Sequence, residues 1–461
     1  MNPLSGALKF LSTTLFNSVL ALAFFLVAGH LATPSFVGKV AIIQLMETIT
    51  GAFFSILPYQ LVTREVSHSY ASSQGYDKIV YTSLSYSLLV SPLLLLLLFF
   101  SSYLWMSIPY FVLYLFTNYQ GQLLTGLGKF TEVNVGNAVF TISRWGFSIL
   151  AIFYHSVELL ILIWTLGAVM KAVYYQIYLP FKFSFDKATF KEIAKVGFPI
   201  YLTGIVYFIS GQGDRVVTAF LLGSYYLGIY QLVALAAVVP SMLTLSFSSS
   251  LLPSSTYYYT KGRDMKEISS ISFRIVTLIS LPMAILGYAI SPLFISKFFP
   301  QYVPGIPSMQ LLILSLTSTM PLQLLSTFMI AAKKNYRPFI IIGIISAAEV
   351  VGVSYYLIPR IGIYGAAIAQ AFNAIITSLL YLLFSHFQGV FKMERREIAS
   401  LALIGFSFLA LTNWWEVILI VVLLGFKLLG IIGNEEVKVI EGFTPYSLKR
   451  ITRILYLIAR Q

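Results

Sequence analysis

Acidic and basic side chains interrupt several of the most apolar stretches of this sequence, and the clearest case is Asp214-Arg215. The pair follows two glycines, Gly211 and Gly213, inside an apolar run over residues 197–222. Counted back from the end of that run, Asp214 lies about 13 Å along a helix, close to the middle of a bilayer. An isolated Asp or Arg there costs about 2.5 to 3.5 kcal/mol to insert, so a partner or a wet cavity must compensate it.

These two residue types suggest two kinds of chemistry. A carboxylate at membrane depth can hold a proton or a cation, and a guanidinium can neutralise a phosphate. Adjacent residues point about 100° apart on a helix, so Asp214 and Arg215 are expected to reach different neighbours rather than each other.

Two further acids and four further bases fall inside apolar runs. Glu47, in the second run, and Asp214 both lie about ten residues from the run ends, so we interpret them as cavity side chains, with interhelical ion pairing as the alternative. The third acid is Glu349, in the eleventh run. Arg274 and Lys427 are interpreted as bases that extend from an inner helix end to the membrane surface. The roles of the other two bases, Arg144 and Lys171, stay open at this point.

Composition defines the class of protein. The chain has 461 residues, of which 58% are hydrophobic and only 10% charged, and its mean hydropathy is +0.84. These values exclude a soluble protein with a polar surface and indicate a polytopic membrane protein. The sequence has no Cys, and its four His are scattered without metal-ligand spacing, so neither a disulfide framework nor a metal site is expected.

The apolar runs have the length of membrane-spanning helices and predict an all-α fold with about 14 spans, 12 being the lower count. The connections between them are short, so no inserted soluble domain is expected. The runs cover residues 10–29, 38–62, 79–100, 106–127, 137–154, 158–179, 197–222, 225–252, 268–290, 306–332, 338–357, 362–385, 398–412 and 415–432.

The positions of Lys and Arg predict how the chain is oriented. With the N-terminus inside, only three of the 30 Lys and Arg fall in outward loops, namely Lys39, Lys297 and Arg360. The inward loops carry most of the others, as the positive-inside rule requires. Both termini are therefore expected to be cytoplasmic in the plasma membrane. The same distribution explains the net charge of +13 by proximity to anionic lipid, so nucleic acid is not an expected partner.

A charged connector after the sixth run predicts two lobes. Weak repeats support the division, because Phe36-Val37-Gly38 and Leu227-Gly228-Ile229 each open the second run of a half. An even number of spans per half gives parallel repeats with a substrate site between them. The expected parts are an N-lobe (1–180), a cytoplasmic linker (181–196), a C-lobe (197–385), an extra helix pair (386–433) and a cytoplasmic amphipathic tail (434–461).

Two motifs carry a resemblance to a known family. The charged residue late in the seventh run is followed by a turn at Gly223 and by Gly228-Ile229-Tyr230, and residues 358–367 end in Gly362-Ile363-Tyr364-Gly365-Ala366-Ala367. This pattern resembles the Wzx-like polysaccharide flippases of the multidrug/oligosaccharidyl-lipid/polysaccharide exporter (MOP) superfamily. The resemblance implies two pseudo-symmetric six-helix lobes around a central cavity that spans 1, 2, 7 and 8 line, plus a C-terminal helix pair.

The resemblance also implies a function. Wzx-like proteins move an oligosaccharide on a polyprenyl phosphate or pyrophosphate from the cytoplasmic to the outer leaflet, for surface polysaccharide or glycan assembly. Arg215 is the first candidate to bind the anionic head group and Arg144 the second, with Glu47 in the same substrate site. Asp214, Glu47 and Glu349 are candidates for ion coupling or gating. The alternative is a cation-coupled antiporter for drugs or organic cations of the same superfamily, which Asp214 and Glu47 also fit.

The sequence gives little reason to expect an enzyme. It shows neither clustered carboxylates at a membrane edge nor a nucleophile beside a base, and it has no Walker A motif and no channel filter loop. No catalytic residue or cofactor is therefore predicted, although Na+ or H+ could serve as the coupling ion. The expected partners are the lipid-linked oligosaccharide, membrane lipids and other membrane proteins of glycan assembly.

Overall fold

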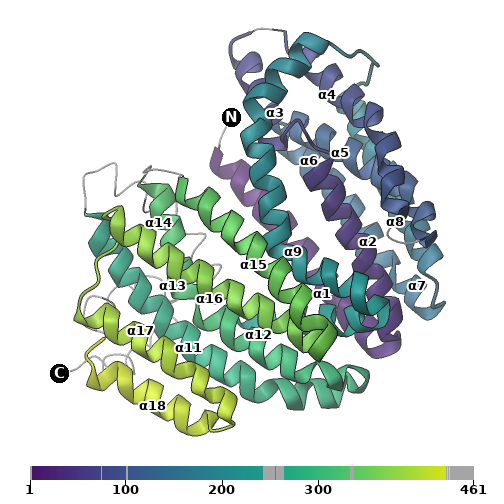
Figure 1. The fold of residues 1–461 in the computed structure, drawn as a ribbon. Coiled ribbons are helices and arrows are strands. Elements are labelled where there is room, and N and C mark those ends of the chain that lie inside the picture. The colour runs from purple at the N-terminus through teal and green to yellow at the C-terminus, as the bar shows by residue number, and fades with distance from the viewer. Residues whose placement is uncertain are drawn as a thin grey trace. The chain divides into compact units, whose positions relative to one another are not determined.

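A computed structural model describes residues 3–73, 75–99, 102–241, 255, 264–332, 337–431, 433 and 436 of the protein. In this part of the chain the regular structure is helical, and no strand occurs (Figure 1). The helices form two compact units, Met1–Ile229 and Tyr230–Gln461. The predicted all-α class is confirmed, whereas the predicted lobe and linker boundaries stay predictions.

The first unit contains the helices that carry Glu47, Arg144, Lys171 and Asp214. The break between α6 and α7 is a π-helical turn, Ile142–Phe147, and Arg144 lies in it. The helices are α1 (Pro3–Leu31), α2 (Pro34–Phe53), α3 (Tyr59–Ala71), α4 (Asp77–Leu89), α5 (Ile108–Gly126), α6 (Phe130–Thr141), α7 (Ile149–Phe153), α8 (Val157–Tyr178) and the first part of α9 (Lys187–Val238).

The second unit is built around α11, against which the C-terminal helix pair packs. Leu281 of α11 is fully buried in one apolar cluster with Leu403 of α17 and Val422 of α18. The helices after α9 are α11 (Met265–Phe298), α12 (Ile306–Ser318), α13 (Met320–Gln323), α14 (Leu325–Ala331), α15 (Arg337–Ile361), α16 (Ile363–Phe387), α17 (Arg395–Ser407) and α18 (Trp415–Leu428).

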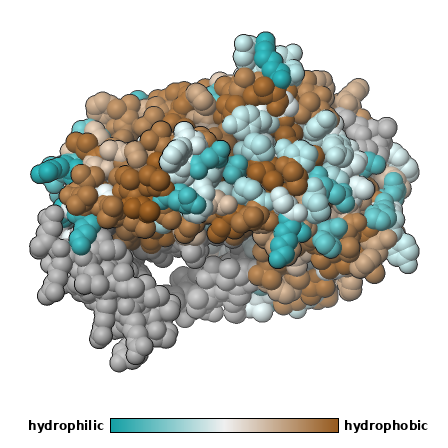
Figure 2. Space-filling model, turned by 90° about the horizontal axis from the view of Figure 1, so that it is seen from below, coloured by the Kyte–Doolittle hydropathy of each residue, from teal (hydrophilic) through white to brown (hydrophobic). Residues whose placement is uncertain are grey.

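Each of the fourteen predicted spans contains helix in the described part of the chain. Within that part, eight helices are long and apolar enough to cross a membrane, and a ninth span results if the bent segment over Pro300–Ala331 counts as one. Large side chains remain exposed on the helices, as with Phe220 (79%), Leu293 (74%) and Phe387 (73%). Broad hydrophobic areas are accordingly visible on the surface in Figure 2. Exposure on this scale marks a surface that lipid covers, so this is a multi-pass membrane protein.

The second predicted span is interrupted. The run over residues 38–62 divides into α2 and α3, with non-helical backbone between Phe53 and Tyr59. Pro58 lies directly before α3 in extended conformation, which suits the start of a helix because proline lacks the N–H that a helix interior needs. Glu47 is consequently less than two turns from the end of its helix, and the exposed backbone of the break needs a protein or water environment.

Helix α9 contains part of the connector, the seventh predicted span and the first part of the eighth. This helix begins at Lys187, inside the predicted linker, and changes direction at Gly223, whose φ of 75° favours glycine. Its start is stabilised by Asp186, whose carboxylate accepts hydrogen bonds from the Ala188 N–H at 3.1 Å and the Thr189 hydroxyl at 2.8 Å. The hydrogen bond from Thr189 lowers the pKa of Asp186.

The second family-like motif joins α15 to α16. Gly362 has φ 63°, which lets the chain reverse between the two helices. A Cβ atom on Gly365 would lie 2.7 Å from the Leu357 backbone carbon, and Ala366 and Ala367 are fully buried. The small residues of this motif therefore serve tight helix packing, which is their ordinary role in membrane proteins.

The predicted amphipathic tail over residues 434–461 lies outside the described residues apart from Glu436.

Candidate functional site

The most prominent polar site of the first unit is an ion pair between α2 and the π-helical turn. Arg144 Nη1 donates to Glu47 Oε1 at 2.9 Å, and Nη2 donates to Oε2 at 2.6 Å, so the pair is bidentate. Tyr110 of α5 donates its hydroxyl to Glu47 Oε2 at 2.8 Å. Because Glu47 is only 7% exposed, removing either charge would leave its partner buried and unpaired, at a cost of about 3 to 5 kcal/mol.

Aromatic rings enclose the Arg144 guanidinium. Its central carbon lies 4.5 Å from the ring centre of Trp164 and 4.7 Å from that of Trp145, with Phe140 at 5.6 Å. The Trp164 indole N–H also donates to the backbone oxygen of Arg144 at 2.9 Å. Arginine combines bidentate pairing with stacking in this way because its guanidinium is planar and weakly hydrated. The side chain is thus held in one orientation.

Lys171 of α8 lies beside this pair. Its ammonium nitrogen is 5.4 Å from the ring centre of Phe140 and 5.6 Å from that of Tyr175, and the residue is 7% exposed. Within the described residues, no carboxylate oxygen lies within 4.0 Å of this ammonium. The Glu47–Arg144 pair is neutral as a unit, so Lys171 gives the cluster a net positive charge.

The Asp214-Arg215 pair lies in α9. Asp214 is buried, at 1% exposure, and Thr218 donates to its backbone oxygen at 2.7 Å. Arg215 is half-buried, and its Nη1 donates to Gln212 Oε1 at 2.5 Å, one turn earlier in the helix. The two side chains form no ion pair with each other within 4.0 Å, as expected of helix neighbours.

Glu349 belongs to a separate polar group in the second unit. Asn373 of α16 donates to Glu349 Oε2 at 3.2 Å and to the hydroxyl of Ser346 at 2.5 Å. The other carboxylate oxygen, Oε1, is buried and has no hydrogen-bond partner in the described part of the chain. A buried acceptor of this kind suits a proton or a small cation.

The structure thus joins Glu47 with Arg144, whereas Asp214 and Arg215 lie in α9 and Glu349 lies in the second unit. It also adds Lys171 and Tyr110, which sequence reasoning did not select. The sequence signal for Lys171 is a base in the middle of the apolar run 158–179. Its role does not follow from that signal, because neighbours such as Phe140 come from other helices. In the described chain, no group of three His, Asp or Glu side chains is arranged to hold a metal ion.

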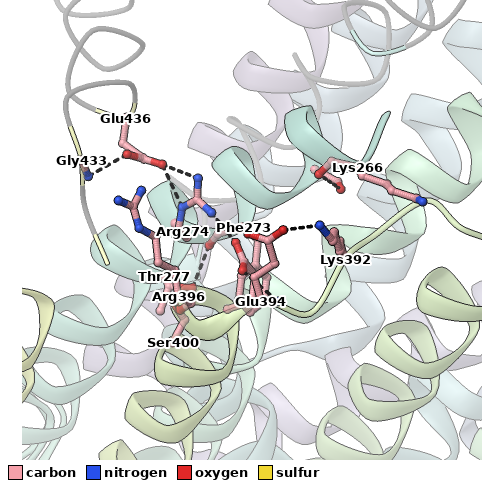
Figure 3. A network of polar contacts seen from close by, with 12 residues as sticks. Lys266, Phe273, Arg274, Thr277, Lys392, Glu394, Arg396, Ser400, Gly433 and Glu436 are labelled. Atoms are coloured by element: carbon pink, nitrogen blue, oxygen red, sulfur yellow. Dashed lines mark hydrogen bonds and ion pairs between the residues drawn. The ribbon is translucent and has the colours of Figure 1, made fainter. Parts of the chain in front are cut away.

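The interpretation of Arg274 as a base extending to the membrane surface is wrong. Its side chain is 9% exposed and is bound by two buried acids, Glu397 of α17 and Glu436. Figure 3 shows the contact between Arg274 and Glu436. Arg274 Nε donates to Glu436 Oε1 at 2.8 Å, and the Gly433 N–H donates to Glu436 Oε2 at 2.7 Å. Both acids lie more than 120 residues away in sequence, so the apolar run alone could not reveal them. Lys427, by contrast, is exposed.

Comparisons with known proteins agree with this architecture. Residues 129–302 match a family described as "Polysaccharide biosynthesis protein". A search of curated proteins gives no match. The fold is similar to an inward-facing multidrug resistance MATE family transporter of the MOP superfamily, with TM-score 0.64 and 15% identity over 81% of this chain and 94% of that one. It is also similar to the lipid II flippase MurJ in an inward closed conformation, with TM-score 0.60 and 15% identity over 91% and 97%.

The class that the fold defines is therefore a multi-pass membrane protein whose fold is similar to that of these two membrane proteins. Within that class, the match over residues 129–302 is to polysaccharide biosynthesis proteins. The resemblance to the Wzx-like branch, drawn from the motifs around Gly223 and Gly362, agrees with this match and with the two similar folds.

Proposed function

We propose that this protein is a flippase that moves an oligosaccharide linked to a polyprenyl phosphate or pyrophosphate from the cytoplasmic to the outer leaflet. Alternating access of two lobes would carry the polar part across, while the polyprenyl tail stays in lipid. The family match to polysaccharide biosynthesis and the fold likeness to a lipid II flippase support this substrate class. The protein would act in the plasma membrane beside other proteins of glycan assembly.

The observation that carries the proposal is the positive charge inside the first unit. Away from the run ends, Arg144, Lys171 and Arg215 lie within its apolar runs, against two acids, Glu47 and Asp214. Glu47 is already satisfied by Arg144, which leaves Lys171 beside a neutral pair. An ammonium at such a place can neutralise a phosphate oxygen through a charge-assisted hydrogen bond.

Arg215 remains the first arginine candidate for the head group. It is half-buried, and its Nη1 bonds only a neutral amide in the contacts described above, whereas both terminal nitrogens of Arg144 hold Glu47. We assign Arg144 the task of fixing Glu47 next to Lys171. Asp214 and Glu349 are the candidates for a coupling Na+ or H+.

The second candidate function is a cation-coupled antiporter for organic cations. The fold likeness to a multidrug resistance transporter favours it, as does the buried carboxylate of Asp214. Against it stands the neutralisation of Glu47 by Arg144, because a cation site needs an acid that is not already paired.

The test is transport by the purified protein in vesicles. A fluorescent polyprenyl-diphosphate oligosaccharide and a fluorescent organic cation would be assayed in parallel, with Lys171→Met, Lys171→Arg and the matched control Lys195→Met. A charge-assisted hydrogen bond contributes about 1.5 to 3 kcal/mol, so Lys171→Met should slow flipping at least tenfold. Lys171→Arg should retain it, as should Lys195→Met, because Lys195 is exposed near the start of α9. Transport of the organic cation without flipping would overturn the proposal.

A further inference from the structure

A second polar pocket lies in the first unit, where the break between α2 and α3 faces the first half of α9. Its volume is about 360 Å³. The side chains that line it and can bond or stack come from both segments: Ser55, Tyr59, Gln60, Tyr201, Thr203 and Tyr207. Small residues give it room, since a Cβ atom added to Gly204 would meet no atom within 4 Å.

The lining is aromatic and hydroxyl-rich but carries no charged side chain. Tyr201 donates its hydroxyl to the Phe53 backbone oxygen at 2.9 Å, which fixes its ring on the pocket wall and satisfies the exposed backbone of the break. Tyr59 is held by an edge-to-face contact with Tyr119, at 5.0 Å between ring centres. Tyr207 is 47% exposed and Gln60 is exposed, so a ring face and an amide group remain available to a ligand.

A lining of aromatic rings and hydroxyl groups without charge indicates which kind of ligand the pocket can bind. A phosphate would need a cationic side chain, and an organic cation would need an acid, and the lining provides neither. A neutral sugar ring presents an apolar C–H face that packs on an aromatic ring and hydroxyl groups that bond amides and hydroxyls. A volume of about 360 Å³ is near the lower end for small-molecule sites, which fits one or two sugar rings.

The pocket is also close to the charge cluster along α2. Gly51, in the pocket lining, follows Glu47 by four residues, so the two share one helix face and are about 6 Å apart along the axis. The Tyr114 ring lies near that face: a Cβ atom added to Gly51 would be 3.9 Å from the Tyr114 ring. A phosphate near Lys171 and a sugar attached to it could therefore be held side by side.

We propose that this pocket binds the first one or two neutral sugar rings of the lipid-linked glycan. The inference rests on the proposed function and adds a specificity site to it. Tyr207 supplies the stacking face, and Gln60 supplies the amide that bonds sugar hydroxyls. With both termini cytoplasmic, α2 and α9 place the pocket in the inner half of the membrane, where the substrate is loaded.

The test compares two ligands on the full-length protein in detergent. One probe is polyprenyl diphosphate carrying a neutral disaccharide, and the other is polyprenyl diphosphate without sugar. Gly204→Leu fills the pocket from an exposed position on a helix, so the variant should fold. Gly405→Leu in α17 is the matched control, because a Cβ atom there also meets nothing within 4 Å.

We expect Gly204→Leu to weaken binding of the glycosylated carrier at least tenfold and to leave binding of the sugarless carrier unchanged, with Gly405→Leu like wild type for both. Tyr207→Phe should keep the affinity for the glycosylated carrier and Tyr207→Leu should lose most of it, because stacking needs the ring rather than its hydroxyl.

Two outcomes would overturn the sugar site while leaving the flippase proposal intact: equal affinity of wild type for both carriers, or an unchanged affinity of Gly204→Leu for the glycosylated carrier, with flipping retained in vesicles. Failure of wild type to bind or flip either carrier would instead overturn the flippase proposal itself.

Discussion

At the scale of single residues, the charges around Glu47 in the first unit are of two kinds: two of them form an ion pair and the third does not within the described residues. Glu47 and Arg144 are mutually satisfied by two hydrogen bonds and a third from Tyr110. Lys171 is buried against aromatic rings without an ion-pair partner in the described chain. The first kind contributes to a fixed local geometry, and the second is the charge that the proposed function assigns to the substrate phosphate.

The Glu47–Arg144 pair predicts a non-additive effect on stability. Glu47→Gln and Arg144→Met should each destabilise the protein by about 3 to 5 kcal/mol, because each leaves a buried charge unpaired. The double variant should lose less than the sum, since it removes both charges. Thermal unfolding in detergent, followed by Trp fluorescence, measures the cycle. Additive losses would show that the two charges do not interact.

Replacing Asp214 is expected to affect transport rather than folding. Asp214→Asn should insert and fold nearly as wild type while losing gradient-dependent flipping, because the amide keeps the size of the side chain but cannot take up a proton or cation. Flipping rates at several pH values and Na+ concentrations would measure this. Wild-type rates with an unchanged dependence on pH and Na+ would return Asp214 to a structural role.

At the scale of elements, two glycines from matching places in the two halves meet. A Cβ atom on Gly38 of α2 would lie 1.6 Å from the Ser224 backbone oxygen, and one on Gly228 of α9 would lie 1.8 Å from the Pro34 oxygen. The hydroxyls of Ser35 and Ser224 are 3.2 Å apart at the same crossing. The two repeat motifs of the sequence therefore form one backbone contact, which only glycine permits at this distance.

Because of this close contact, any side chain at Gly38 should destabilise the protein. Gly38→Ala should destabilise the protein by at least about 1 to 3 kcal/mol, the usual range for overpacking, because backbone atoms must move apart. Gly405→Ala, in open space on α17, should be neutral or slightly stabilising. Melting temperatures of the two variants in the same detergent would test this, and an unchanged value for Gly38→Ala would argue against the contact.

At the scale of the whole molecule, orientation in the membrane decides which leaflet loads the substrate. The positive-inside rule predicts that both termini and the connector before α9 are cytoplasmic. The chain is free of cysteine, so a single introduced thiol reports its own side. Asp186 is unsuitable for this purpose because its carboxylate caps α9, whereas Lys182 is exposed four residues earlier.

A cysteine at Lys182 should therefore resist an impermeant thiol reagent applied to intact cells and react after the cells are opened. A cysteine at Lys297, which is exposed near the end of α11 and predicted to face outward, should react from outside. Labelling with the opposite pattern would invert the orientation and would place the proposed sugar pocket in the outer half of the membrane.

Much of the fold followed from the sequence, because apolar run length and charge scarcity are local properties. Each predicted span contains helix in the described part of the chain, and the family resemblance followed from short motifs. The break after Phe53 and the start of α9 at Lys187 were not predicted. Both concern backbone conformation inside stretches whose composition permits a continuous or a broken helix equally well.

The partners of the buried charges were decided by tertiary structure. The sequence by itself determined that charges such as Glu47, Asp214 and Arg274 lie in apolar runs and need compensation. It could not show that Arg144 forms an ion pair with Glu47. Nor could it show that Arg274 pairs with Glu397 and Glu436, because the partners in each pair lie far apart in the chain. An ion pair depends on a few ångströms of side-chain separation, and only the packing of the helices sets that distance.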